Sequence, residues 1–173
     1  MSGWTRLFNI FLIILYLITG FFITKSSVYL NPYTNDVNIA TAHKYATWSS
    51  VLVWFLLAFT IIGIVLYFVY YAEGGAELQL VQSQASSGWG ATLFFIIMLI
   101  LLTITGILSA AAAHYIQISS PYTGGNKDVA IAYTDAVVAA CLCIGIVLLV
   151  LVAIAVIYHQ NNKPKEVELQ NMV

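Results

Sequence analysis

Residues 136–158 read AVVAACLCIGIVLLVLVAIAVIY and contain no charged side chain. A helix needs about 20 predominantly apolar residues to cross a hydrocarbon core roughly 30 Å thick, so this stretch predicts a membrane span. Three further charge-free stretches predict spans near residues 7–23, 51–71 and 91–112. Backbone N–H and C=O groups in lipid must be paired within the protein, and the alternating pattern of a transmembrane barrel is absent, so we expect four helices.

The composition points to the same class of protein. The 173-residue chain is 61% hydrophobic and 8% charged, against roughly 45–50% and about 25% in soluble globular domains. Six Lys and Arg against seven Asp and Glu give a net charge of −1, which provides no basic surface for nucleic acid. We therefore expect an all-α integral membrane protein in contact with the lipid bilayer.

The first apolar stretch follows Arg6 and could instead be a cleaved signal peptide. Its length exceeds the usual apolar region of a signal, and Thr24-Lys25-Ser26 does not resemble the small-residue cleavage pattern. We therefore interpret it as a span.

Short sequence motifs recur in the two halves of the chain in the same order. The offset between the two copies of a motif ranges only from 85 to 92 residues. Each copy contains two expected spans, an even number, so both copies enter the membrane in the same sense and are parallel repeats. We predict a four-helix bundle of two tandem hairpins, residues 1–84 and 85–160, followed by a polar tail, 161–173. The matched motifs are Ser2-Gly3-Trp4 with Ser87-Gly88-Trp89, Ile18-Thr19-Gly20 with Ile104-Thr105-Gly106, Pro32-Tyr33-Thr34 with Pro121-Tyr122-Thr123, and Asp36-Val37 with Asp128-Val129.

Small side chains predict where helices approach each other. Helices in lipid associate largely through close packing at small residues, and the third and fourth spans carry them at helical spacing. The expected packing residues are Gly106, Ala110, Cys141 and Gly145. Cys141 and Cys143 are two positions apart in a helix and should point to different faces, which argues against a mutual disulfide.

The expected spans carry no ionisable residue at mid-depth, where proton relays and ion pathways have them. His43, His114 and His159 share no ligand spacing and are interpreted as interfacial polar residues rather than metal or haem ligands. Phosphate-binding, dinucleotide-binding, nucleophile-elbow and zinc-protease motifs are also absent from the sequence. We expect no enzyme activity, no cofactor and no metal site.

Four crossings place both termini on one side of the membrane. Arg6, Lys163 and Lys165 lie on that side, whereas Lys25, Lys44 and Lys127 lie in the two longer loops expected at 24–50 and 113–135. The positive-inside rule is therefore tied, three against three. We place the termini on the cytoplasmic side because Arg6 and the polar tail lie at span ends, and because each loop lysine has an acidic residue in its own loop.

The two loops suggest a surface that binds a partner. Pro32 and Tyr33 in the first loop, and Pro121 and Tyr122 in the second, would present the same turn twice at one end of the bundle. Tyr offers a large ring with a hydrogen-bonding tip, which suits an interface. Asp36 and Asp128 are expected to cap the helices that follow.

These observations favour a non-catalytic structural or assembly component of a membrane-embedded complex, in an organelle membrane or the membrane of a virion. Its expected partners are membrane proteins or further copies of the same chain. The alternative is a small oligomeric channel or carrier for a neutral solute, since parallel repeats occur in transporters. The loops lack the Cys-Cys-Gly motif of tetraspanins and the Trp and paired Cys of claudins, so the sequence is assigned to no family.

Overall fold

The structure is a computed structural model that describes residues 3–73 and 89–161, with side chains described over 7–65 and 96–155. These residues form helices and no strand, which confirms the all-helical prediction for this part of the chain. The helices are α1 (Gly3–Leu30), η1 (Asn31–Tyr33), α2 (Val37–Glu73), α4 (Trp89–Gln117), α5 (Ser120–Thr123) and α6 (Lys127–Asn161).

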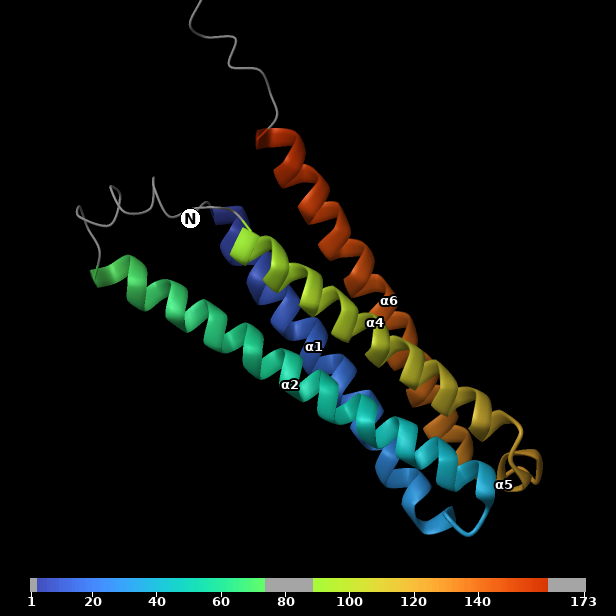
Figure 1. The fold of residues 1–173 in the computed structure, drawn as a ribbon. Coiled ribbons are helices and arrows are strands. Elements are labelled where there is room, and N and C mark those ends of the chain that lie inside the picture. Colours follow the sequence, from blue (N-terminus) through green and yellow to red (C-terminus); the bar gives the residue numbers. More distant parts are fainter. Residues whose placement is uncertain (1–2, 74–88, 162–173) are drawn as a thin grey trace, which may run out of the picture.

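The four long helices form a closed ring in which each packs against two neighbours. Helix α1 contacts α2 and α6, and α4 contacts the same two helices from the other side. Helices α1 and α4 run in the same direction, opposite to α2 and α6, and the short helices η1 and α5 lie at one end of the bundle (Figure 1). The bundle is narrowest at this end, called here the loop end, and its helices spread apart toward the other (Figure 1).

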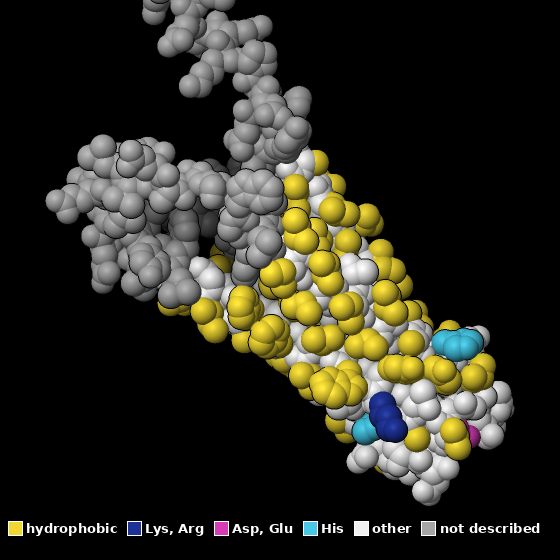
Figure 2. Space-filling model, viewed as in Figure 1, with side chains coloured by type: hydrophobic (Ala, Val, Ile, Leu, Met, Phe, Trp, Pro, Cys, Tyr) yellow, Lys and Arg dark blue, Asp and Glu magenta, His cyan; other side chains and the backbone are white. Residues whose placement is uncertain are grey.

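Four helical segments, one on each long helix, are long and apolar enough to cross a membrane, and the first continues from α1 through η1. These segments are Leu7–Tyr33, Val37–Val65, Ile96–Gln117 and Lys127–Ala155. Large apolar side chains cover the flank of the bundle, while the charged and His side chains visible on this face lie toward the loop end (Figure 2). Apolar patches of this extent are unusual on soluble monomers.

The prediction of long loops at 24–50 and 113–135 is wrong. Helices α1 and α2 are separated only by 31–36, and α4 and α6 by 118–126, within which η1 and α5 form single turns. The helices continue past the apolar stretches because the buried alanines Ala42, Ala46 and Ala132 let them stay in close contact at the loop end. A charged residue such as Lys25 therefore marks the end of an apolar stretch without ending the helix.

Side-chain caps start α2 and α6. The Asp36 Oδ1 accepts hydrogen bonds from the backbone N–H of Asn38 (2.9 Å) and Ile39 (3.1 Å), as predicted. In the second half Asn126, not Asp128, is the cap: its Oδ1 accepts from the N–H of Asp128 (3.0 Å) and the next residue (3.2 Å). Asp128 lies in the first turn of α6, where a carboxylate is favoured by the helix dipole. Gly125 precedes this cap with φ of +78°, a conformation that a side chain would strain.

The core consists of two clusters. The loop-end cluster contains many small side chains, and the middle cluster contains larger ones that fill the wider part of the bundle. Leu56, Leu102 and Ile146 from three helices are almost completely buried in the middle cluster. Buried side chains from all four long helices thus contact one another at the loop end and in the middle of the bundle.

Candidate functional site

The four residues predicted to bind a partner all lie at the loop end. Pro32 is exposed in η1, and Pro121 is half-buried in α5. Each proline lies in the first turn of its short helix, where its fixed φ is compatible with helix and its missing N–H costs nothing. Both turns therefore lie at the same end of the molecule (Figure 1).

The two tyrosines of these turns also make contacts within the chain. The Tyr33 hydroxyl donates a hydrogen bond to the Asp128 Oδ2 at 3.1 Å, which connects η1 to the start of α6. The Tyr122 ring lies 5.1 Å, between centroids, from the ring of Tyr133. Both rings pack against the loop-end cluster. Their role in binding a partner remains a prediction.

An ion pair joins α1 to α6. The Lys25 Nζ lies 3.1 Å from the Asp135 Oδ2 and 3.5 Å from its Oδ1. The Asp135 side chain is only 6% exposed, whereas that of Lys25 is 34% exposed and lies 5.6 Å from the centroid of the Tyr29 ring. Beside the pair, the Ser26 hydroxyl donates to the carbonyl of Ala132 at 2.8 Å. We call these five residues the charged seam.

Sequence reasoning placed both charges of this seam in loops and missed their contact. Lys25 comes two residues after the expected first span, and Asp135 directly before the expected fourth. The sequence did contain a signal for this contact, because the two residues carry opposite charges and lie at span ends expected on the same side of the membrane. With the helices extended past these positions, the two charges face each other within the bundle.

The described polar contacts between α2 and α4 involve no charged side chain. The Ser49 hydroxyl donates to the carbonyl of Thr105 at 3.1 Å and lies 2.7 Å from the Ser109 hydroxyl, with both serines buried. Because Ser49 has one proton to donate, Ser109 is the donor in the second bond. Closer to the loop end, the rings of Tyr45 and Tyr115 lie 5.7 Å apart. We call these five residues the tyrosine seam.

Polar contacts also join α1 to α2 within the first hairpin. The hydroxyls of Thr24 and Ser50 lie 2.6 Å apart, and the Trp54 Nε1 donates to the Thr24 Oγ1 at 3.0 Å. A Cβ added at Gly20 would lie 3.2 Å from the Trp54 ring. A glycine therefore permits close contact of α1 and α2, whereas small packing residues were expected from the sequence only on the third and fourth spans.

The predicted packing residues divide between the inside and the outside of the bundle. A Cβ added at Gly106 would lie 3.2 Å from the Cβ of Cys143, so α4 and α6 are close there. At Gly145 an added Cβ meets nothing within 4 Å, and Ala110 and Cys141 are exposed. Helix α6 thus turns Cys143 inward and Cys141 outward, which confirms that the two thiols point to different faces.

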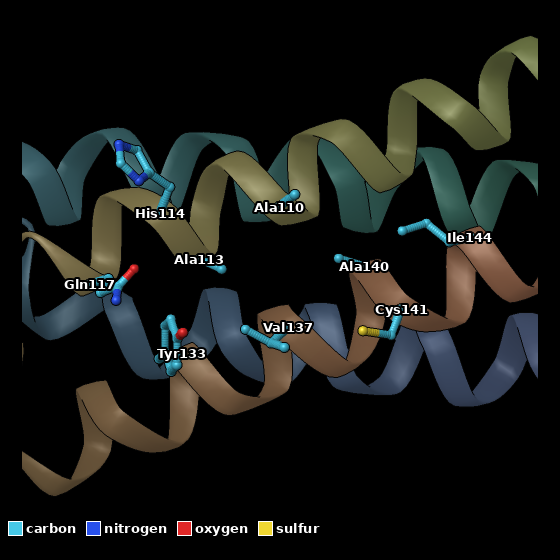
Figure 3. A pocket seen from close by; sticks show the side chains of 9 residues that line it. All are labelled: Ala110, Ala113, His114, Gln117, Tyr133, Val137, Ala140, Cys141 and Ile144. Carbon is cyan, nitrogen blue, oxygen red and sulfur yellow. The ribbon is translucent and has the colours of Figure 1, made fainter.

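A shallow outer groove of about 280 Å³ runs between α4 and α6. Small side chains, including Ala110, Ala113 and Cys141, form part of its walls, while Gln117 and Tyr133 lie at its loop end (Figure 3). The expected packing residues Ala110 and Cys141 therefore line a surface groove rather than the contact between helices.

Among the described side chains, no group of three or more His, Cys, Asp or Glu is placed to hold a metal ion. His43 is half-buried on α2, and His114 is exposed on α4. The side chains of Trp4, Arg6, Trp89 and His159, together with the polar tail after residue 161, lie outside the described residues.

No family model, curated protein or solved structure matches the chain. The geometry of the bundle is therefore the basis for assigning a function.

Proposed function

We propose that the protein is a multi-pass membrane protein with a non-catalytic role, a structural or assembly component of a membrane-embedded complex. The observation that carries this proposal is a filled interior beneath an apolar exterior. In the middle cluster Leu56, Leu102 and Ile146, from three different helices, are almost completely buried, and a solute passing between these helices would have to displace them. Outward-facing Leu7, Phe21 and Val152 are among many large apolar side chains suited to contact lipid or a neighbouring subunit.

The burial pattern supports a duplicated hairpin. Buried positions of α2 recur 90 residues later in α6, and buried positions of α1 recur 86 residues later in α4. Helices α1 and α4 also run in the same direction, as parallel repeats require (Figure 1). Pairs that are buried in both copies are Ile39 with Val129, Ala42 with Ala132, Ala46 with Ala136, Val53 with Cys143, Leu56 with Ile146, Tyr16 with Leu102, Thr19 with Thr105, and Leu30 with Ile116.

The loop end is the proposed surface for a membrane-protein partner. The exposed Pro32 lies in a 3₁₀ turn without a side-chain cap, and the half-buried Pro121 lies in an α-helical turn capped by Ser119, so the two turns share a proline and a tyrosine but not their geometry. Tyr33 and Tyr122 both pack against the loop-end cluster. Two points of contact at the same end would allow a partner to bind both hairpins at once.

We further propose that the termini face the cytoplasm. Lys25 is neutralised within the bundle by Asp135, which leaves the exposed Lys44 and Lys127 as the free lysines of the loop end. Three basic residues of the sequence lie near the termini, so the balance of free positive charge favours that side.

The alternative is an oligomeric channel or carrier for a neutral solute. One observation favours it: Asp135 is an acidic residue buried within a helix apolar enough to span a membrane, and such residues often mark transport pathways. Its direct pairing with Lys25 is equally compatible with a role in packing.

Purification of the full tagged chain in mild detergent, followed by mass spectrometry, tests the proposed role. We expect a stoichiometric membrane-protein partner, and we expect its recovery to fall when Tyr33→Ala and Tyr122→Ala are combined. Ile107→Ala, on the exposed flank of α4, is the matched control and should leave recovery unchanged. A ring of this chain alone that transports a neutral solute into liposomes would overturn the proposal in favour of the alternative.

A further inference from the structure

The two seams occupy corresponding places in the two proposed repeats. With offsets of 86 residues for α1 and α4 and 90 for α2 and α6, Lys25 corresponds to Ala111, and Asp135 corresponds to Tyr45. Tyr29 of the charged seam corresponds to Tyr115 of the tyrosine seam. The charged seam therefore has an ion pair at the positions where the tyrosine seam has an alanine and a tyrosine ring.

From this difference we infer that the Lys25–Asp135 pair selects which hairpin packs against which, so that the first hairpin pairs with the second rather than with a copy of itself. The inference rests on the tandem-repeat part of the proposed function. The partner that the ion pair selects for each hairpin is the other hairpin of the same chain.

Equivalent faces make wrong pairings geometrically accessible. If the first hairpins of two chains packed together, Lys25 would face Tyr45 of the other chain. If the second hairpins packed together, Asp135 would face Ala111 of the other chain and would be buried without a cation. A buried charge that lacks its partner is strongly disfavoured. The pairing of two second hairpins is therefore the more strongly penalised, because Asp135 is buried, whereas Lys25 in a pairing of two first hairpins loses its carboxylate but stays partly solvated. The mixed pairing is the one in which both charges are compensated.

The geometry of the pair agrees with a role in selection. Asp135 is almost fully buried at the contact, and the Lys25 Nζ lies within 3.5 Å of both carboxylate oxygens. The neighbouring bond from the Ser26 hydroxyl is made to the backbone carbonyl of Ala132. Because any residue at that position has a carbonyl, this second bond does not distinguish one hairpin from the other, whereas the carboxylate does.

Two complementary charge reversals test the inference in the full chain. A Lys25→Asp chain has acidic residues on both faces, and an Asp135→Lys chain has basic residues on both. Neither chain can form the ion pair internally. When the two are mixed, each first hairpin meets the compatible second hairpin of the other chain. We therefore expect the two variants to form an exchanged heterodimer.

The measurement is co-expression of the two variants with different tags, capture through one tag in mild detergent, and quantification of the other. We expect at least about tenfold more second tag than for two wild-type chains, which corresponds to about 1.4 kcal/mol. Co-expression of two Lys44→Asp chains, altered at an exposed residue of α2 outside the seam, should give the wild-type level.

A single chain carrying both Lys25→Asp and Asp135→Lys restores the pair with its charges exchanged. It should be captured with a differently tagged copy of itself at the wild-type level. The inference would be overturned if the co-expressed single variants were captured with each other only at the wild-type level. It would also be overturned if co-expression did not restore the yield of folded protein for the two variants. These readouts use only this chain, so they are independent of whether another protein co-purifies with it.

Discussion

The two seams between the hairpins differ in chemistry although their burial patterns agree. In the charged seam, Lys25 and Asp135 form an ion pair beside the Tyr29 ring. In the tyrosine seam, the Tyr45 ring contacts Tyr115, and polar bonds are limited to hydroxyls and a carbonyl. The comparison indicates that the repeated pattern of small and apolar residues provides packing, which both seams share. In the inferred pairing role, the difference in charge would discriminate between otherwise similar faces.

The two seams should also respond differently to loss of one member. Removing one partner of a buried ion pair leaves the other charge desolvated and without an opposite charge beside it, which destabilises the fold. A hydroxyl that loses its partner can bond elsewhere along its own helix, so hydrogen bonds between membrane helices are worth about 0.6 kcal/mol on average. Experiments on single residues can therefore separate the contribution of charge from that of packing.

The largest expected effect concerns the glycines that allow close packing in both halves. Gly20 and Gly106 occupy corresponding positions in the proposed repeats, and a Cβ at either would lie 3.2 Å from a neighbouring helix's side chain. We expect Gly20→Leu and Gly106→Leu each to destabilise the fold by about 3 kcal/mol, because overpacking forces the helices apart. Thermal unfolding in detergent measures the effect. Gly145→Leu is the control and should be nearly neutral, since a Cβ there meets nothing within 4 Å.

The next largest effect distinguishes the two ends of the ion pair. Lys25→Ala leaves Asp135 buried without a cation, and we expect a loss of about 2 kcal/mol, below the usual cost because Lys25 is partly solvated. Asp135→Ala should cost less, because Lys25 is 34% exposed and its ammonium can turn outward. Unfolding midpoints of the two variants provide the comparison. A larger loss for Asp135→Ala would contradict the assigned burial of the two charges.

A smaller effect is expected in the tyrosine seam. Ser49→Ala removes the donor to the Thr105 carbonyl and the acceptor for Ser109, and we expect a loss of about 1 kcal/mol. Unfolding under the same conditions as for Lys25→Ala tests whether charge outweighs hydroxyl bonding. If Ser49→Ala were the more damaging of the two, the tyrosine seam would hold the hairpins together more strongly than the ion pair.

The smallest expected effect is at the loop end. Tyr33→Phe removes the hydroxyl that donates to the exposed carboxylate of Asp128 and keeps the ring against the core. We expect a loss of about 0.5 kcal/mol, at the low end for a single hydrogen bond. Tyr33→Ala also removes the ring and should cost clearly more. Equal midpoints for these two variants would show that the ring contributes nothing to the loop end.

Several features could be predicted from composition and periodicity alone. Four long apolar stretches predict four helices because lipid-compatible segments must pair their own backbone groups. The two-residue spacing of Cys141 and Cys143 predicts that they lie on different faces, and Asp36 before an apolar run predicts a cap. These are properties of one segment, set by helix geometry or by groups close in sequence.

Other features depended on contacts between segments. The pairing of Lys25 with Asp135 and the close approach of Gly106 to Cys143 both join helices far apart in the chain. The sequence also could not tell that Gly145 and Ala110 point outward, because small-residue spacing defines a face of a helix but not the direction in which that face turns. That direction is decided when each helix packs against two neighbours at once. The lengths of the helices at the loop end are decided in the same way, since packing among all four keeps polar segments helical beyond their apolar stretches.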